Sequence, residues 1–289
     1  MQPSDDLLDR GKALSQQPTA QLVVTALNIA IAHPDPDDDE RHVYWYLVGT
    51  MHERGGATEF EAASRLVAST DPIERALGCD ILGQLGWGKA FVEESVGLLI
   101  ERLADTNERV ISSALSALGH RRSLRAIEPA LALVDHPKAD IRIGVVRPLS
   151  CQEDRRATDA LIKLSRDTDR DVRDWATFGL GSMCAADYSE LRDALRERLT
   201  EVDAEIRSEA MEGLARRKDT GVIPAIIAAL ESDDVIAGYL SAAIEAADPV
   251  LLPALMKLQA HVRPDEEDYW VGMLHDAISA CNPGNRSNS

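Results

Sequence analysis

The chain has 289 residues, of which 45% are hydrophobic and 4% aromatic, with 31 Lys or Arg against 49 Asp or Glu. With so few aromatic side chains, Ala, Leu, Ile and Val must fill the core, which favours closely packed helices over β-sandwiches or barrels. The net charge of −18 argues against direct binding to nucleic acid, because most of the surface would repel the phosphate backbone.

Residues 1–70 are predicted to form an N-terminal helical cap. Helical patterns cover DDLLDRGKALSQ, TAQLVVTALNIAIA, RHVYWYLVGTMHE and ATEFEAASRLVAS, with an acidic break at HPDPDDDE. We expect the acids of this break to lie at a helix N-terminus, where the dipole favours negative charge. The cluster Tyr44-Trp45-Tyr46 follows it. Because three consecutive helical residues point in different directions, at least one of them is expected to face the core.

A nine-residue pattern then recurs at spacings of 33, 31, 31, 34 and 29 residues. It begins with Leu, Ile or Val and repeats apolar residues at offsets +4 and +8, which lie on one stripe of an α-helix. The six copies are Leu77–Leu85, Val110–Leu118, Ile141–Leu149, Val172–Leu180, Ile206–Leu214 and Val235–Ala243.

A second helical pattern lies between successive copies, in Ala126–Pro137, Ala157–Asp169, Leu191–Asp203 and Val222–Asp234. Each unit is therefore a helical hairpin that can bury its apolar faces only against its neighbours. The predicted fold is all-α, an α-solenoid of about six stacked hairpins over residues 71–260, with the second helices lining its concave surface. Residues 261–289 are expected to add a C-terminal capping helix and a tail.

The repeated residues resemble HEAT repeats, in particular the short bacterial kind described as phycobilisome-lyase-like. The marks are an Asp-rich turn, a small residue at offset +4, a Leu-Gly close and an apolar-Arg pair. The apolar-Arg pairs are Ile141-Arg142, Val172-Arg173 and Ile206-Arg207. The resemblance covers about two thirds of the chain and implies a superhelical scaffold. The HEAT family includes scaffolds, inhibitors and a few enzymes, so the resemblance does not fix an activity.

Arginines recur at two places in the pattern. Those of the apolar-Arg pairs are expected to bind turn acids such as Asp135 or Asp167 in a ladder between repeats. The clusters Arg121-Arg122, Arg155-Arg156 and Arg216-Arg217-Lys218 are expected in solvated turns, with favourable charge at helix C-termini. A basic ridge for RNA is the alternative, and the net charge argues against it.

Two aromatic residues interrupt rows that are otherwise polar or small. At offset +3 the other repeats have Asp, Ser, Gly or Glu where this chain has Trp175, and at offset +6 Phe178 stands among Gly, Ser, Arg and Glu. We predict that Trp175 and Phe178 form an exposed protein-binding pair, since Trp is enriched among interface hot spots. The alternative is that Trp175 fills the space beside Gly144. Trp87, in a Leu-Gly-Trp-Gly turn, and the Tyr44-Trp45-Tyr46 cluster are further candidates.

Catalytic and metal sites are not predicted. HEAT-type deoxyhypusine hydroxylases carry several His-Glu dipeptides, whereas this chain has one, His52-Glu53, and HEAT-like DNA glycosylases need a cationic concave face. The seven His residues show no zinc-hydrolase spacing, and no nucleotide-binding loop is present. The chain is therefore predicted to be no enzyme and to hold no cofactor or metal.

The predicted location is the cytoplasm. The start, MQPSDDLLDRGK, lacks the basic flank and apolar run of a signal peptide, and no segment is apolar enough to span a membrane. The four cysteines show no C-x-x-C spacing and are expected to be reduced.

The functional prediction is a non-catalytic solenoid that binds a protein. Residues 171–289 carry 22 acidic against 11 basic side chains, so a basic partner is favoured, for example a toxin neutralised by an immunity protein. One alternative is a chromophore or small-molecule transfer enzyme using Cys151 and Cys184, and another is a general assembly scaffold. The oligomeric state is left open.

Overall fold

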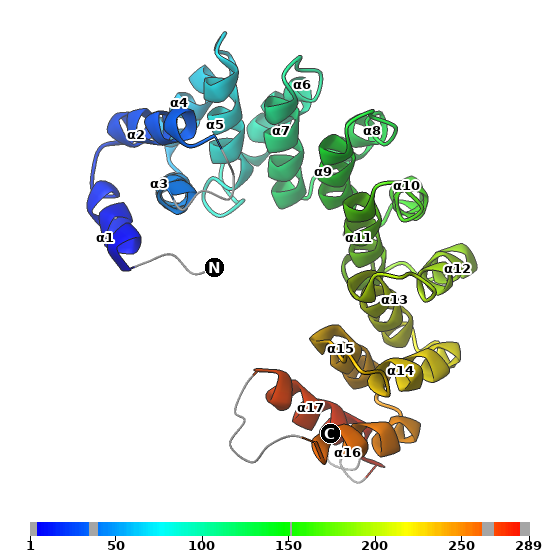
Figure 1. Cartoon of the computed structure of the whole chain (residues 1–289). Helices are drawn as coiled ribbons and strands as arrows, with labels where there is room; N and C mark the ends of the chain where they lie inside the picture. Colours follow the sequence, from blue (N-terminus) through cyan, green and yellow to red (C-terminus); the bar gives the residue numbers. More distant parts are fainter. Residues whose placement is uncertain (1–4, 35–39, 151, 262–268, 284–289) are drawn as a thin grey trace. The chain divides into compact units, whose positions relative to one another are not determined.

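The computed structural model describes residues 5–34, 40–150, 152–261 and 269–283. It has two compact units, residues 1–149 and 150–289. The described residues form α-helices with short 3-10 and π segments and no strand, which confirms the predicted all-α class (Figure 1).

The N-terminal unit consists of helical hairpins. Asp71 accepts a hydrogen bond from the Ile73 amide and Asn107 accepts one from Arg109, so a turn residue caps each of two first helices. The helices are α1 (Asp5–Leu14), α2 (Thr19–Ala32), α3 (Glu40–Arg54), α4 (Ala57–Val67), α5 (Pro72–Gly83), α6 (Val92–Arg102), α7 (Glu108–Arg121), η1 (Leu124–Ala126), α8 (Ile127–Leu131) and α9 (Ala139–Leu149).

The C-terminal unit continues the alternation. Asp169 and Asp203 each accept two backbone N–H groups at the start of a first helix, which is the physical reason for the Asp-rich turn. Its elements are α10 (Arg155–Leu164), α11 (Arg170–Phe178), η2 (Gly179–Met183, a π-helix), α12 (Ser189–Arg198), α13 (Ala204–Arg216), η3 (Thr220–Val222), α14 (Ile223–Leu230), α15 (Ala237–Ala246), η4 (Pro249–Leu251), α16 (Leu252–Gln259) and α17 (Tyr269–Cys281).

The predicted first helices are confirmed. The six copies of the pattern lie on α5, α7, α9, α11 with η2, α13 and α15. The apolar stripe is the core of each unit, since Val172, Ala176 and Leu180 have no exposed surface. Burying such stripes between neighbouring hairpins is the main stabilising contribution.

The residues expected in caps also have defined places. The expected N-terminal cap comprises α1 to α4, in which Tyr44 is buried and Trp45 is half exposed, as three consecutive helical residues require. In α17, buried Val271 and Leu274 belong to a face that packs on α15. The compact units divide between Leu149 and Ser150, so the boundaries at residues 70 and 260 stay predictions. Asp35–Asp39 and residues 265–268 lie outside the described residues.

Within the C-terminal unit, the first helices form the inner row. Figure 1 shows α11, α13 and α15 on the inside of the bend and α10, α12 and α14 on the outside. The prediction that second helices line the concave surface is therefore wrong for this unit. The reason is packing at small residues. A Cβ added to Gly213 would lie 2.5 Å from the Gly181 Cα atom, and one added to Gly238 would lie 2.3 Å from the Ser208 hydroxyl.

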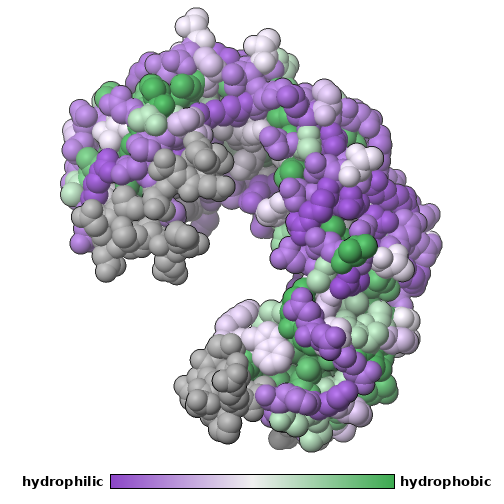
Figure 2. All heavy atoms as spheres, viewed as in Figure 1, coloured by the Kyte–Doolittle hydropathy of each residue, from purple (hydrophilic) through white to green (hydrophobic). Residues whose placement is uncertain are grey.

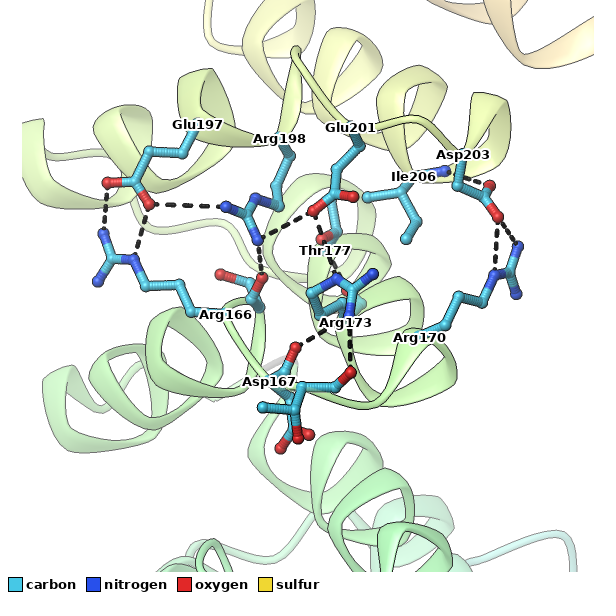
Figure 3. Close-up of polar contacts among 12 residues, drawn as sticks. Arg166, Asp167, Arg170, Arg173, Thr177, Glu197, Arg198, Glu201, Asp203 and Ile206 are labelled. Atoms are coloured by element: carbon cyan, nitrogen blue, oxygen red, sulfur yellow. Dashed lines mark hydrogen bonds and ion pairs between the residues drawn. The ribbon is translucent and has the colours of Figure 1, made fainter.

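The arginines of the apolar-Arg pairs hold turns together through backbone carbonyls (Figure 3). Arg173 donates to the carbonyls of Asp167 and Thr168 at 3.0 and 3.1 Å, and its Nε lies 3.3 Å from Glu201 in the next turn. Arg207 repeats this contact on its own turn and reaches the Tyr239 hydroxyl at 2.7 Å. The predicted ladder between repeats exists, but its partners differ. Arg173 binds the backbone carbonyl of Asp167, and the carboxylate that it contacts is that of Glu201 in the following repeat.

Two arginines expected in solvated turns have a different role. Arg121 is buried and donates to the Leu82 and Ala90 carbonyls of the preceding hairpin. Arg217 donates five hydrogen bonds to carbonyls, four of them in residues 180–186 of the preceding hairpin. Burial lowers the pKa of Arg121 to about 10 and also lowers that of Arg217. Both therefore serve as links between hairpins.

Candidate functional site

Trp175 and Phe178 form an aromatic pair on α11. The Trp175 side chain is 44% exposed, Phe178 is half-buried, and their rings meet edge to face with centroids 6.0 Å apart. The exposure predicted for Trp175 is confirmed, and the atoms nearest a Cβ added to Gly144 belong to Leu115 and not to Trp175. A large aromatic side chain left in solvent is the kind of group that protein interfaces bury.

Carboxylates lie on the same helix as this pair and on the next first helices, α13 and α15. Asp174 precedes Trp175, and Glu209 on α13 accepts a hydrogen bond from the Ser182 hydroxyl at 3.3 Å. Glu212 lies near both Glu209 and Glu245, and the negative charges of these carboxylates repel one another. We call this surface the acidic–aromatic face, defined by Asp174, Trp175, Phe178, Glu205, Glu209, Glu212 and Glu245.

Two arginines neutralise part of its charge. Arg170 contacts Asp203 and Glu205, both at 2.8 Å, and Arg216 contacts Glu212 at 2.6 Å and Glu245 at 3.3 Å. The face therefore has five carboxyl groups and only these two guanidinium groups to pair with them, so acidic groups are in excess. Figure 2 shows mainly hydrophilic residues over α10 to α13, whereas apolar residues gather over α14 and α16.

The surroundings of Glu209 oppose its ionisation. Burial is the main cause, with the charges of Glu212 and Asp174 adding to it, and together they raise the Glu209 pKa to about 7. Burial also raises the pKa values of Glu212 and Asp174. An incoming cation would offset this unfavourable electrostatic energy, so the face is suited to positively charged groups.

Replacing Glu209 by Gln should change how stability depends on pH. The folded-state pKa of about 7 exceeds the ordinary value of 4.5, so the folded protein binds this proton more tightly than the unfolded chain. The stabilisation is therefore complete below pH 4.5 and is lost as the pH rises to about 7. After discounting for partial exposure, urea unfolding should show wild type losing roughly 1–2 kcal/mol more than E209Q between pH 5 and pH 8. Equal losses would contradict this prediction.

Trp87 lies in the N-terminal unit, in the turn between α5 and α6. Its side chain is 60% exposed, and its ring meets that of His52 with centroids 6.0 Å apart. It also lines a cavity of about 620 Å³ together with residues of α3. Of the further candidate cluster Tyr44-Trp45-Tyr46 on α3, Trp45 is half exposed and Tyr44 is buried.

The cysteines considered for transfer chemistry do not form a described site. Cys184 is buried, and its sulfur lies 3.7 Å from the Thr158 hydroxyl. A cavity of about 520 Å³ lies beside it, lined by Arg155, Met183 and Tyr188 among others, and Cys184 is not among the lining residues. Cys151 lies outside the described residues. Within the described ranges, no group of three or more His, Cys, Asp or Glu is arranged to hold a metal ion.

Stacked helical hairpins, linked by arginines and buried apolar stripes, define an α-solenoid. A family model described as HEAT repeats matches residues 96–181 and 158–248, together more than half of the chain. The chain belongs to the HEAT-repeat family. The matches support HEAT repeats in general, and the phycobilisome-lyase-like subdivision stays a prediction.

Among curated proteins, YibA of Escherichia coli strain K12 is 29% identical over 210 residues, which is 70% of this chain and 74% of YibA. The crystal structure of E. coli YibA superposes with a TM-score of 0.69 at 21% identity, covering 96% of this chain and 98% of YibA. At these identities, likeness to solved structures shows the fold.

Larger helical solenoids also match. A mutant of Kap121p gives a TM-score of 0.67 at 14% identity, covering 91% of this chain and 36% of Kap121p. Kap95p, which binds RanGDP, gives 0.61 at 14% identity, covering 97% of this chain and 42% of Kap95p. No helix in the described part of the chain combines the length and apolar character needed to cross a membrane.

Proposed function

We propose that this chain is a non-catalytic, cytoplasmic HEAT-repeat protein that binds a basic protein partner through the acidic–aromatic face. The observation that carries the proposal is the exposed Trp175, paired with Phe178 and flanked by carboxylates whose ionisation burial opposes. A lysine or arginine of the partner would relieve the repulsion between Glu209 and Glu212, and the tryptophan would supply apolar area.

The fold is compatible with this role. Stacked hairpins present a continuous row of helices, and the Kap95p solenoid, which binds RanGDP, has the same architecture. Basic toxins that act on nucleic acid are one class of partner with suitable chemistry, in which case the chain would be an immunity protein. A general assembly scaffold would use the same face on a different basic partner.

Neutralising the face should weaken binding of a basic partner. We expect the triple variant Glu205→Gln, Glu209→Gln, Glu245→Gln to bind about tenfold more weakly and to lose much of the salt dependence, since long-range attraction contributes to both. The partner would first be identified by affinity capture from a lysate of the native host. Its affinity would then be measured by calorimetry at two salt concentrations.

The matched control removes the same charge elsewhere in the unit. Glu231, Asp233 and Asp234 are exposed in the turn between α14 and α15. Replacing them by Gln, Asn and Asn changes the net charge equally when both variants are measured at about pH 9, where Glu209 is ionised. Equal weakening by both triple variants would mean that net charge, and not this face, attracts the partner. Capture of acidic partners that both variants bind unchanged would contradict the proposal.

A further inference from the structure

The cavity beside Trp87 is a second place where the chain presents aromatic and acidic groups together. It lies in the N-terminal unit, measures about 620 Å³, and falls within the usual size range of binding pockets. The turn after α1, one side of α3 and the turn after α5 line it, with Tyr46, Gly49, Glu53 and Trp87 among the lining residues.

The backbone holds Trp87 in place. Gly86, Trp87 and Gly88 have φ values of +57°, +52° and +82°, a left-handed conformation that glycine adopts readily and tryptophan rarely does. The Gly86 amide donates to the His52 carbonyl at 2.8 Å, and a Cβ added to Gly55 would lie 2.5 Å from the Gly86 nitrogen. The turn is thus packed tightly on the end of α3, and the Trp87 side chain that it carries is 60% exposed.

Two charged side chains, Arg54 and Glu53, are among the lining residues of the cavity, and among the residues that the structure describes, groups of the chain itself bind only the first of them. Arg54 is held by the α1–α2 turn, donating to the Ser15 and Gln17 carbonyls and to the Thr19 hydroxyl, which in turn donates to the buried Glu59. Glu53 is exposed and has no ion pair or hydrogen bond within the described part of the chain. Burial lowers the pKa of His52, so the ring beside Trp87 is neutral at pH 7.

The floor of the cavity leaves room for a side chain. Gly49 lies in the middle of α3, and a Cβ added there would meet no atom within 4 Å. Alanine would be more favourable than glycine in a helix interior, so helix stability does not explain the glycine. The missing side chain instead keeps the space between Tyr46 and Glu53 open.

We propose that this cavity binds a lysine or arginine side chain on a segment of a protein partner, with the cation against the Trp87 ring and the Glu53 carboxylate. The inference rests on the proposed function in taking a protein as the occupant, and it adds a contact in the N-terminal unit. A fixed aromatic face and an unpaired carboxylate are the two groups that attract a cation most directly at a partly exposed site.

The test uses the full chain and a defined probe. Acetyl-Gly-Lys-Gly-amide is titrated into protein labelled with nitrogen-15, and the four indole N–H signals are followed by NMR after assignment with single Trp→Phe variants. The Trp87 signal should shift saturably with the lysine peptide and should not shift with the matched norleucine peptide, which has the same chain without the charge.

Variants of the lining residues sharpen the result. Glu53→Gln should weaken the lysine peptide about threefold to tenfold. Gly49→Phe should abolish the shift by filling the cavity, and Gly49→Ala, which adds one methyl group, should retain it. Trp175→Ala should leave the Trp87 response unchanged.

Three outcomes would overturn the inference, namely no shift at Trp87, an equal shift with norleucine, or equal shifts at all four indoles. Should the inference fail while the Glu205, Glu209 and Glu245 variants still weaken the partner, the proposed function stands without it. A saturable Trp87 shift would support the cavity even where those variants had no effect.

Discussion

Replacing Arg217 by Ala is expected to lower the free energy of unfolding by about 3 kcal/mol or more. This is the largest loss of stability that we expect from replacing an arginine of this chain. The Arg217 guanidinium donates to the carbonyls of Leu180, Gly181, Cys184, Ala186 and Gly213, at distances between 2.7 and 3.2 Å. Removing it leaves half-buried carbonyls without a donor, and no water or neighbouring amide replaces five converging N–H groups at small cost. Urea unfolding followed by circular dichroism measures the loss.

The neighbouring arginine provides the control. Arg216 is exposed, makes one exposed hydrogen bond to a carbonyl, that of Ser182 at 3.1 Å, and forms ion pairs with Glu212 and Glu245, so Arg216→Ala should cost about 1 kcal/mol. Arg217→Lys should fall between the two alanine variants, because an ammonium group has three donors and lacks the planar fork of a guanidinium. Similar losses for Arg216→Ala and Arg217→Ala would show that the carbonyl contacts do not carry the effect.

Replacing both Trp175 and Phe178 by Ala should weaken partner binding by about 2 kcal/mol or more, roughly a thirtyfold loss of affinity. Trp175 is 44% exposed in the free protein, so most of its contribution is expected in the complex. The stability of the free chain should change less, because truncation removes an edge-to-face contact and only part of a buried surface. Calorimetry with the captured partner measures the affinity.

Exposed apolar residues elsewhere in the unit give the comparison. Val250 and Met256 are 60% and 58% exposed, in η4 and α16, and neither belongs to the acidic–aromatic face. The double variant Val250→Ala, Met256→Ala should bind the partner as wild type does. Unchanged affinity after truncation of Trp175 and Phe178 would remove these two residues from the interface.

The architecture was predictable because stacked hairpins repeat one local pattern. Apolar residues at offsets 0, +4 and +8 can lie on one stripe only in a helix, and the acidic turns supply the caps at Asp169 and Asp203. The exposure of Trp175 was predictable in the same way. A large side chain at a position where the other repeats have small or polar residues has no equivalent pocket waiting for it.

The roles of individual arginines were not predictable. Arg216 and Arg217 are adjacent in the sequence, yet Arg216 is exposed and reaches one carbonyl of the preceding hairpin, whereas Arg217 is half-buried and reaches four. Which of them turns inward depends on where α13 ends and where a distant π-helix leaves carbonyls exposed. A composition or spacing pattern contains neither piece of information.

The acidic side of the candidate site was visible in the sequence only as a row of polar residues. Glu209 and Glu212 occupy the offsets at which Trp175 and Phe178 stand one repeat earlier, so stacking brings the two pairs together. The inner position of the first helices could have been inferred from their glycines. Gly181 and Gly213 permit a close approach of the backbone that a Cβ atom at either position would prevent.

The π-helical segment η2 limits how far these hairpins can be treated as interchangeable modules. Its wider turn leaves carbonyls at Leu180 and Gly181 that find their donors on Arg217, a residue of the next hairpin. Transplanting the α11–α12 hairpin into another array, without the α13–α14 hairpin that follows it, would leave the Leu180 and Gly181 carbonyls without the Arg217 donor. A designed repeat protein that uses this sequence should therefore include both hairpins together.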